Sequence, residues 1–120
     1  MQPTVVIVDD HEGFRTHARR LLEAGGIGVL GEAADGSSGL ELVRRLDPDA
    51  VLLDVQLPDI DGFEVARRLS AAGSASRIVL ISTRGAEDYG ERIDDSPALG
   101  FIGKVDLSAS KVRALLGAAP

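Results

Sequence analysis

Four short hydrophobic segments recur along the chain, at residues 5–8, 50–53, 78–81 and 99–102. Their apolar residues follow one another instead of alternating with polar ones, which is typical of strands buried on both faces of a parallel sheet. A weaker segment of the same kind lies at residues 27–30. The pattern therefore predicts five parallel strands.

Amphipathic segments lie between these strands and predict helices, because their apolar residues recur at helical spacing. These residues are Phe14, Ala18, Leu21 and Leu22, then Leu40, Val43 and Leu46, then Val65, Ala66, Leu69 and Ala72. Asp61 and Glu64 have the spacing of a capping box at the start of the third helix. The last helix is expected to begin at Ser108. Residues 86–93 have few apolar anchors, so we expect only a short, weakly held helix there.

A strand followed by a helix, repeated five times, predicts a single α/β domain over residues 1–120, built as a three-layer sandwich. Connections between parallel strands are right-handed. With five such units, the flavodoxin-like (βα)5 arrangement is favoured, with a five-stranded parallel sheet in the order 2-1-3-4-5.

The composition excludes several classes of protein. The chain has 120 residues, 44% hydrophobic and 27% charged, and no cysteine, so disulfide scaffolds and thiolate metal sites are excluded. Its apolar runs are too short to span a membrane, and no basic stretch at the N-terminus indicates a secretory signal. We therefore expect a cytoplasmic protein without membrane contact. The net charge of −6 argues against direct nucleic-acid binding.

Polar side chains follow four of the predicted strands. Asp9 and Asp10 end the first, Asp54 the third, Ser82 the fourth and Lys104 the fifth. The carboxyl ends of the strands meet at one edge in such folds, and functional sites lie there. The first and third strands are neighbours in the expected order, so three carboxylates should converge.

Three convergent carboxylates need either a proton or a cation, since each ionised pair at ~4 Å costs roughly 4 kcal/mol. Oxygen ligands favour a hard ion, and we expect Mg²⁺, or Mn²⁺ in its place. An Asp can attack phosphorus, while a metal and Lys104 neutralise the transferring oxygens. No glycine-rich loop follows the first strand, which argues against nucleotide or flavin binding.

Four segments resemble the signature segments of bacterial response-regulator receivers: IVDDH at residues 7–11, LDVQLPDIDG at 53–62, IS at 81–82 and GFIGK at 100–104. The details are most similar to the nitrate-regulator and LuxR-related branch. Ser82 lies 28 residues after Asp54, and Lys104 lies 22 after Ser82. Both distances fit the family, and the resemblance covers the whole chain.

The resemblance implies the roles of the site residues. Asp54 would be the phosphoacceptor, and Lys104 the ammonium that contacts the phosphoryl group. Asp9 and Asp10 would position the metal, with Asp10 as the more direct ligand. Gln56 would offer its backbone carbonyl to the same ion. The domain would then catalyse its own phosphorylation and dephosphorylation, which is not the work of a conventional enzyme.

The resemblance also implies a switch. Ser82 would be the hydroxyl that moves toward the phosphoryl group, with Thr83 as the rival hydroxyl. Phe101 would be the rotating aromatic of the fifth strand. A sensor histidine kinase or a phosphotransfer protein would supply the phosphoryl group. The surface of the fourth helix, fifth strand and fifth helix would signal to an unknown protein target, or form a phosphorylation-dependent homodimer.

Two departures from the family pattern stand out. Receivers commonly have a proline in a cis bond after the lysine, whereas this chain has Val105. A cis bond to valine costs about 3–4 kcal/mol, so we expect a different loop. Gln56 and Arg84 occupy positions that flank the route of the hydrolytic water, so we expect an altered lifetime of the phosphorylated state.

Simpler interpretations exist for most of these residues. Asp9 and Asp10 could cap the first helix, and Ser82 could cap the fourth. Lys104 could be a solvated surface residue. His11 is more readily a solvated loop residue than a metal ligand. By the same reasoning, Phe101 could be plain core and Tyr89 could pack on the weak fourth helix.

Two other functions stay open from the sequence. One is a protein-interaction module that works without phosphorylation on a receiver scaffold. The other is a Mg²⁺-dependent phosphatase or a flavodoxin-like cofactor protein, against which the missing phosphate loop and cap domain argue. No effector domain follows the last predicted helix. Both a stand-alone receiver and the front part of a transcription factor therefore fit.

Overall fold

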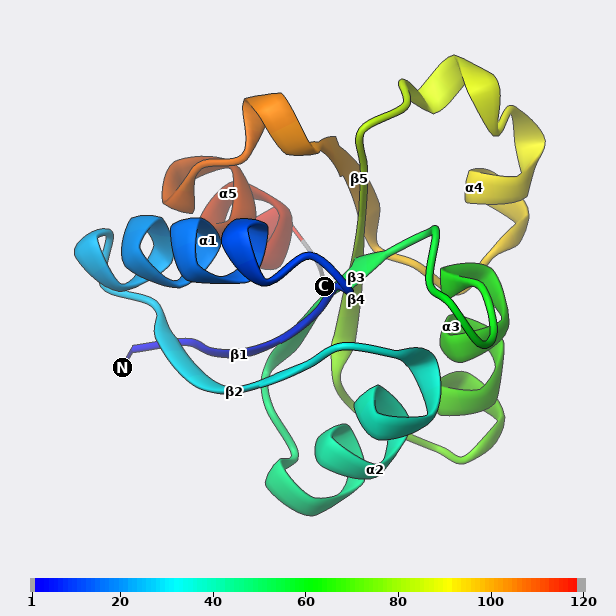
Figure 1. Ribbon diagram of the computed structural model, residues 1–120, viewed down its shortest axis with the longest axis horizontal. Helices are drawn as coiled ribbons and strands as arrows, with labels where there is room; N and C mark the ends of the chain where they lie inside the picture. The colour runs from blue at the N-terminus through cyan, green and yellow to red at the C-terminus, as the bar shows by residue number, and fades with distance from the viewer. Residues whose placement is uncertain (1, 119–120) are drawn as a thin grey trace.

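The computed structural model describes residues 2–118 and contains one parallel sheet of five strands, in the order β2-β1-β3-β4-β5 (Figure 1). The strands are β1 (Thr4–Val8), β2 (Gly28–Ala33), β3 (Ala50–Asp54), β4 (Arg77–Ser82) and β5 (Gly100–Gly103). The predicted strand order is confirmed, with a helix after every strand.

Helices cover both faces of the sheet, which gives the three expected layers (Figure 1). They are α1 (Glu12–Ala24), α2 (Gly36–Leu46), α3 (Gly62–Ala71), α4 (Glu91–Asp95) and α5 (Ala109–Ala118), with 3-10 turns η1 (Ala86–Asp88) and η2 (Lys104–Asp106). Packing places α1 and α5 on one face of the sheet and α2 and α3 on the other.

The continuous hydrophobic runs are explained by two cores, one on each face. In β1, Val5 and Ile7 pack beneath α1 and α5, whereas Val6 and Val8 pack beneath α2 and α3. All four side chains are buried, with an exposed fraction of 1% or less. Successive residues of a strand point to opposite faces. When helices cover both faces, every residue of the strand is therefore in an apolar environment.

Short polar signals set the helix boundaries. Asp61 accepts a hydrogen bond from the Glu64 N–H at 2.9 Å, and Ser108 caps α5 in the same way. Leu107 and Val112 flank that second cap and are both buried, as a hydrophobic staple requires. The predicted starts of α3 and α5 are therefore confirmed.

The segment after β4 is the least regular part of the described chain. It holds only the three residues of η1 and the five of α4, and Gly90 separates them with a φ of 55°. No residue of either turn is buried. The expectation of a short and weakly packed fourth helix is confirmed, and this segment lies directly beside the site described next.

Candidate functional site

The sheet register brings four of the predicted side chains to one edge. Asp9 follows β1, Asp54 ends β3, Ser82 ends β4 and Lys104 follows β5. Adjacent strands are paired so that their ends lie level, with Val8 opposite Leu53 and Ser82 opposite Gly103 in the next strand. Folding thus gathers residues that are up to 95 positions apart in the chain.

Asp9 is fully buried at the centre of this edge. Its Oδ1 accepts a hydrogen bond from the His11 N–H at 2.8 Å. Its Oδ2 lies 2.6 Å from the Lys104 ammonium, yet the contact is an ion pair without a well-directed hydrogen bond. Asp9 Oδ2 is therefore a buried oxygen with capacity left for a further electrophilic partner.

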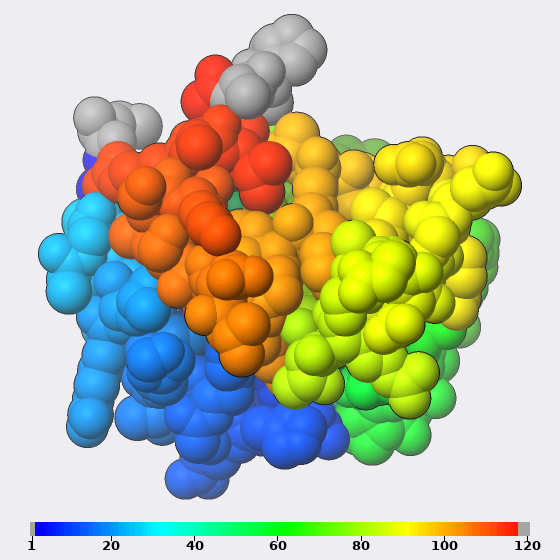
Figure 2. All heavy atoms as spheres, turned by 90° about the horizontal axis from the view of Figure 1, so that it is seen from above, coloured from blue at the N-terminus to red at the C-terminus, as the bar shows by residue number. Residues whose placement is uncertain are grey.

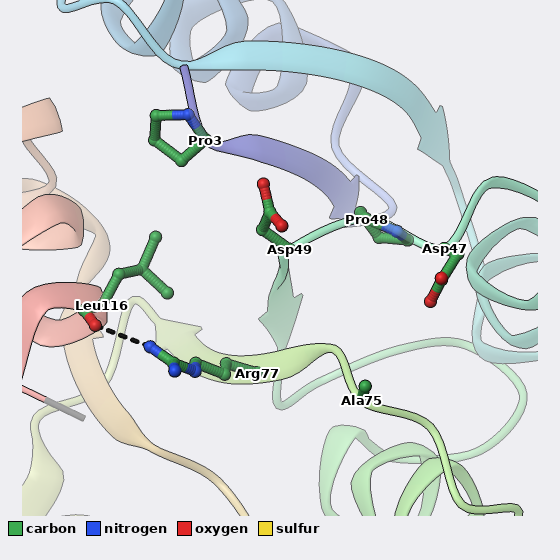
Figure 3. Close-up of a pocket in the computed structure, with 7 residues that line it drawn as sticks. All are labelled: Pro3, Asp47, Pro48, Asp49, Ala75, Arg77 and Leu116. Carbon is green, nitrogen blue, oxygen red and sulfur yellow. Dashed lines mark hydrogen bonds between the residues drawn. The ribbon is translucent and has the colours of Figure 1, made fainter. Parts of the chain in front are cut away.

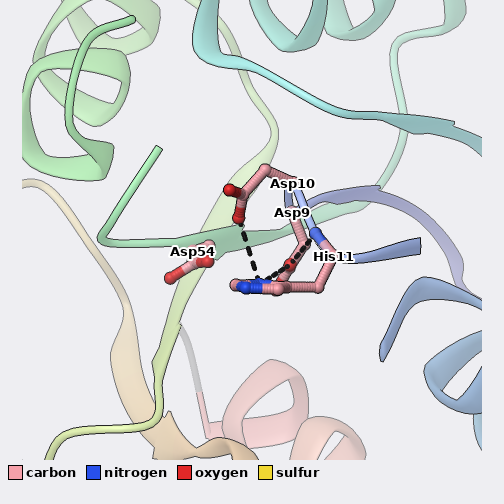
Figure 4. Close-up of side chains that lie close together, drawn as sticks. All are labelled: Asp9, Asp10, His11 and Asp54. Atoms are coloured by element: carbon pink, nitrogen blue, oxygen red, sulfur yellow. Dashed lines mark hydrogen bonds and ion pairs between the residues drawn. The ribbon is translucent and has the colours of Figure 1, made fainter. Parts of the chain in front are cut away.

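Asp10 and His11 form the outer rim of the acidic edge (Figure 4). His11 Nδ1 lies 3.1 Å from Asp10 Oδ1 and 3.3 Å from Asp9 Oδ1, and the His11 side chain is 67% exposed. One ligand atom from each of Asp9, Asp10, His11 and Asp54 falls within 4.8 Å of all the others. The expected convergence of three carboxylates is found.

Lys104 is enclosed, with only 8% of its side chain exposed. Its Nζ lies 3.2 Å from Asp54 Oδ2 and 4.6 Å from the centre of the Phe14 ring. Burial acts to lower the pKa of Lys104, but its pairing with Asp9 and Asp54 outweighs this and raises the pKa. The ammonium stays charged at the edge, and the interpretation of a solvated lysine is wrong.

The Asp54 carboxyl is almost completely buried. Burial raises the pKa of Asp54, and the neighbouring Asp9 charge raises it further. The Gln56 N–H, which donates to Asp54 Oδ1 at 3.1 Å, and the Lys104 ammonium act in the opposite direction. The result is a carboxylate whose negative charge is under-compensated.

These residues fit a hard divalent cation, which family receivers hold in such an acidic pocket. Asp9, Asp10 and Asp54 supply oxygen donors, and Asp9 has a buried oxygen without a hydrogen bond. The Gln56 peptide lies at the rim of the site, and its carbonyl as a further ligand stays a prediction. The same holds for the effect of Gln56 and Arg84 on phosphoryl lifetime.

Ser82 is the enclosed hydroxyl of the fourth strand, with 1% exposure, whereas Thr83 is exposed. Ser82 Oγ accepts the Arg84 N–H at 3.0 Å and lies 2.6 Å from the Tyr89 hydroxyl oxygen. The cap residue of η1 is Gly85, so Ser82 caps no helix.

Tyr89 packs between two other rings of the described chain. Its ring centre lies 5.7 Å from that of Phe63 and 5.9 Å from that of Phe101, which is half-buried. From the sequence we expected Tyr89 to pack on the weak fourth helix, with a partner surface as the alternative. Its hydrogen bond to Ser82 was missed, because no sequence pattern indicates it.

The loop after β5 differs from the family pattern as expected. All peptide bonds of the described residues are trans, and Lys104 begins the 3-10 turn η2. Val105 is 94% exposed. The N-cap residue of α1 is His11, so the interpretation of Asp9 and Asp10 as the caps of this helix is wrong.

A hollow of about 380 Å³ lies at the amino ends of the strands, at the other end of the sheet from these acids (Figure 3). Two of its polar groups are already engaged: Asp49 accepts the Thr4 N–H at 2.8 Å, and Arg77 donates to the Leu116 carbonyl at 2.6 Å. The converging unsatisfied charge identifies the acidic edge, and not this hollow, as the candidate site.

The fold and the acidic edge together define a receiver-type α/β domain. The sequence profile of the response regulator receiver domain matches residues 5–115, which is most of the chain. The chain therefore belongs to the response-regulator receiver family of two-component signalling. No helix in the described part of the chain is long and apolar enough to cross a membrane.

Curated relatives support the same family. The chain is 38% identical over 86 residues to the nitrate/nitrite response regulator NarL of Escherichia coli, covering 71% of this chain and 40% of NarL. It is 35% identical over 101 residues to the response regulator GacA of Pseudomonas aeruginosa, covering 83% of this chain and 47% of GacA. The chain thus spans about half the length of the curated relatives it matches.

Solved structures agree with the fold. The signal receiver domain of NarL from Mycobacterium tuberculosis superposes with a TM-score of 0.90 at 32% identity, covering 98% of both chains. A LuxR-family two-component response regulator from an Aurantimonas species superposes with a TM-score of 0.88 at 28% identity, covering 98% of this chain and 86% of the other. The expected similarity to the nitrate-regulator and LuxR-related branch is confirmed.

Proposed function

We propose that this domain accepts a phosphoryl group on Asp54, from a histidine kinase or a phosphotransfer protein, in a reaction that needs Mg²⁺ or Mn²⁺. The observation that carries the proposal is the position of Asp54, buried among Asp9 and Lys104, with Asp10 at the open rim. This is an arrangement of one nucleophile, further carboxylates and one enclosed cation.

In the transfer step, an ionised oxygen of Asp54 attacks the phosphorus atom of a phosphohistidine. An O–P bond forms, the N–P bond breaks, and the leaving imidazole takes up a proton. Asp54 then carries an acyl phosphate. The transferring oxygens gain negative charge close to Lys104, whose raised pKa keeps it protonated.

The metal ion would be held by Asp9, Asp10, Asp54 and the backbone carbonyl of Gln56. When bound, it would neutralise negative charge on the phosphoryl oxygens. Without it, Lys104 alone faces the charge of both Asp9 and Asp54. This excess of negative charge explains why a cation is expected before a dianionic phosphoryl donor can approach.

The response to phosphorylation would pass through Ser82 and Phe101 to the surface of α4, β5 and α5. Ser82 ends β4, and Phe101 lies in β5 beside Tyr89 of the loosely packed η1–α4 segment. A segment with few buried contacts can take a second arrangement at small cost. The phosphoryl group would select between the two by binding one of them better.

The downstream partner is proposed as a protein surface, either another protein or a second copy of this domain. The net charge of −6 disfavours direct contact with nucleic acid by this part of the chain. A histidine kinase presents its phosphohistidine in the cytoplasm, so we propose that location for the domain.

The test is incubation with phosphoramidate or acetyl phosphate and Mg²⁺, followed by intact-mass measurement. The parent chain should gain one phosphoryl unit, and the gain should vanish with EDTA or in Asp54→Asn. Asp49→Asn is a matched control, because Asp49 lies at the other end of the sheet, and should keep the gain. A parent chain that gains no phosphoryl unit would favour a phosphorylation-independent interaction module instead.

A further inference from the structure

We propose that Tyr89 is a positioning residue that holds the hydroxyl proton of Ser82 in the resting domain, so that a phosphoryl group on Asp54 must compete for it. The inference rests on the proposed function and adds a regulatory contact to it. The structural basis is the 2.6 Å distance between Ser82 Oγ and the Tyr89 hydroxyl oxygen.

Either hydroxyl has a proton for this hydrogen bond, and we infer the direction from the burial of Ser82, whose own proton needs an acceptor. Ser82 Oγ already accepts a hydrogen bond from the Arg84 N–H at 3.0 Å. A serine hydroxyl has a single proton to donate. Among the described residues, the only acceptor that forms a hydrogen bond with Ser82 Oγ is the Tyr89 oxygen. Since Ser82 is buried, its proton is satisfied by donation to Tyr89.

One proton cannot serve two acceptors fully. A phosphoryl oxygen on Asp54 would attract the Ser82 proton, because hydrogen bonds to ionised acceptors are the stronger ones. For Ser82 to donate its proton to the phosphoryl group, its hydrogen bond to Tyr89 must therefore break. The contact stabilises the resting arrangement only. It therefore lowers the population of the arrangement that binds the phosphoryl group through Ser82.

The position of Tyr89 explains how this contact is connected to the rest of the switch. Its ring lies between Phe63 of α3 and Phe101 of β5. In the space-filling view, the yellow-green to yellow surface of η1 and α4 lies beside the orange surface of β5 and η2 (Figure 2). Release of the Tyr89 hydroxyl would therefore free a side chain that contacts both of these surfaces.

The experiment compares the parent with Tyr89→Phe, which removes one oxygen and keeps the ring. The probe is beryllofluoride with Mg²⁺, a mimic of the phosphoryl group on Asp54, titrated by ¹⁹F NMR. We expect Tyr89→Phe to bind it about 2- to 12-fold more tightly, the effect of one net hydrogen bond lost from the resting state. Unchanged or weaker binding would overturn the proposal.

A double-mutant cycle separates this role from packing. In the Ser82→Ala background, Tyr89→Phe should leave the beryllofluoride affinity unchanged, because no serine proton remains to be held. An equal gain in both backgrounds would assign the effect to ring packing and refute the contact. If the parent takes up neither beryllofluoride nor phosphoryl, the proposed function fails. If the parent binds and Tyr89→Phe binds no better, only the role of Tyr89 fails.

A spectroscopic readout tests the contact directly. Tyr89 is the only tyrosine of the chain, so the tyrosine doublet of the Raman spectrum, which reports hydrogen bonding of the phenol, belongs to it alone. We expect the doublet to show an acceptor phenol in the resting domain, and to change in Ser82→Ala and on addition of beryllofluoride. A spectrum that stays the same under both changes would contradict the proposal.

Discussion

Lys104 forms its shorter ion pair with Asp9, at 2.6 Å, although Asp54 also lies within 3.2 Å of the same ammonium. The ammonium therefore compensates a fully buried carboxylate in addition to facing the proposed phosphoacceptor. Removing one partner of a buried pair leaves an uncompensated charge.

This pairing predicts a large effect of Lys104→Met in metal-free solution. We expect the free energy of unfolding to fall by about 3 kcal/mol, because Asp9 is left buried without its cation. Mg²⁺ should restore part of the loss, since a cation replaces the missing charge. Urea unfolding with EDTA and with Mg²⁺ measures both effects.

Lys111 provides the matched control, because it is the only other lysine and is exposed on α5. Lys111→Met should change the stability by no more than about 0.5 kcal/mol. Equal losses in the two lysine variants would show that the Lys104–Asp9 pair is not the cause.

The sequence predicted the strands well because each buried strand carries an uninterrupted apolar run. The edge strand β2 is the exception. The weak hydrophobic segment at 27–30 predicted only the first part of this strand, which continues to Ala33. Its residues Gly31 and Glu32 interrupt the hydrophobic pattern, since an edge strand covered on fewer sides tolerates polar side chains.

The site was predicted in its composition but not in its internal pairing. Strand ends place Asp9, Asp54 and Lys104 together, and that follows from topology alone. Which carboxylate the lysine approaches, and that the Tyr89 hydroxyl meets Ser82, depend on tertiary packing of loops. A tyrosine seven residues after a serine carries no pattern from which this contact could be derived.

The raised pKa of Asp54 predicts that Asp54→Asn stabilises the metal-free domain at neutral pH. Burial makes the native state bind this proton more tightly than the unfolded state, whose ordinary value is 3.8. The contribution of the group to stability is therefore complete below that value and is lost as the pH rises through the higher native pKa. Asparagine does not ionise and avoids this loss.

We expect a gain of about 1 kcal/mol at pH 7, seen as a melting temperature a few degrees higher, with the difference shrinking toward pH 4. Melting curves in EDTA across that pH range measure it. Asp10→Asn is the comparison, because Asp10 is exposed at the rim, and its effect without metal should be smaller. A lower stability of Asp54→Asn at pH 7 would contradict the argument.

Asp59 ties the loop after β3 to the start of α2. Its two carboxylate oxygens accept the Gly36 and Ser37 N–H groups at 2.8 and 2.9 Å. Asp59 is exposed, and although desolvation acts to raise its pKa, these hydrogen bonds outweigh it and hold the pKa well below the ordinary 3.8. The stabilisation is therefore present above that value and is lost as the pH falls through the lower native pKa.

Asp59→Ala should lower the free energy of unfolding by about 1 kcal/mol at pH 7, since two helix-terminal N–H groups lose their acceptor. The difference from the parent should decrease in strongly acidic solution. Asp94→Ala, on exposed α4, is the control and should have little effect. The prediction is wrong if urea unfolding gives the same stability for both alanine variants.

Gly62 lies close against the backbone at the end of β3. A Cβ at this position would overlap the Asp54 carbonyl oxygen and lie 2.9 Å from the Val55 Cα. The Gly62 N–H also donates to the Val55 carbonyl at 2.8 Å. Gly62→Ala must therefore push α3 away from the end of β3, and it should lower the free energy of unfolding by about 2 kcal/mol.

Gly13 is the matched control, because it lies in α1 and a methyl group added there would have nothing within 4 Å apart from its chain neighbours and the nearby backbone of its own helix. Gly13→Ala should be neutral or stabilise by about 0.5 kcal/mol through helix propensity. The pair is measured by urea unfolding and by phosphoryl uptake from phosphoramidate, which Gly62→Ala should slow and Gly13→Ala should leave unchanged. Equal uptake by both variants would show that the position of Asp54 does not depend on this close approach, because the strand end would then keep its geometry after α3 has moved.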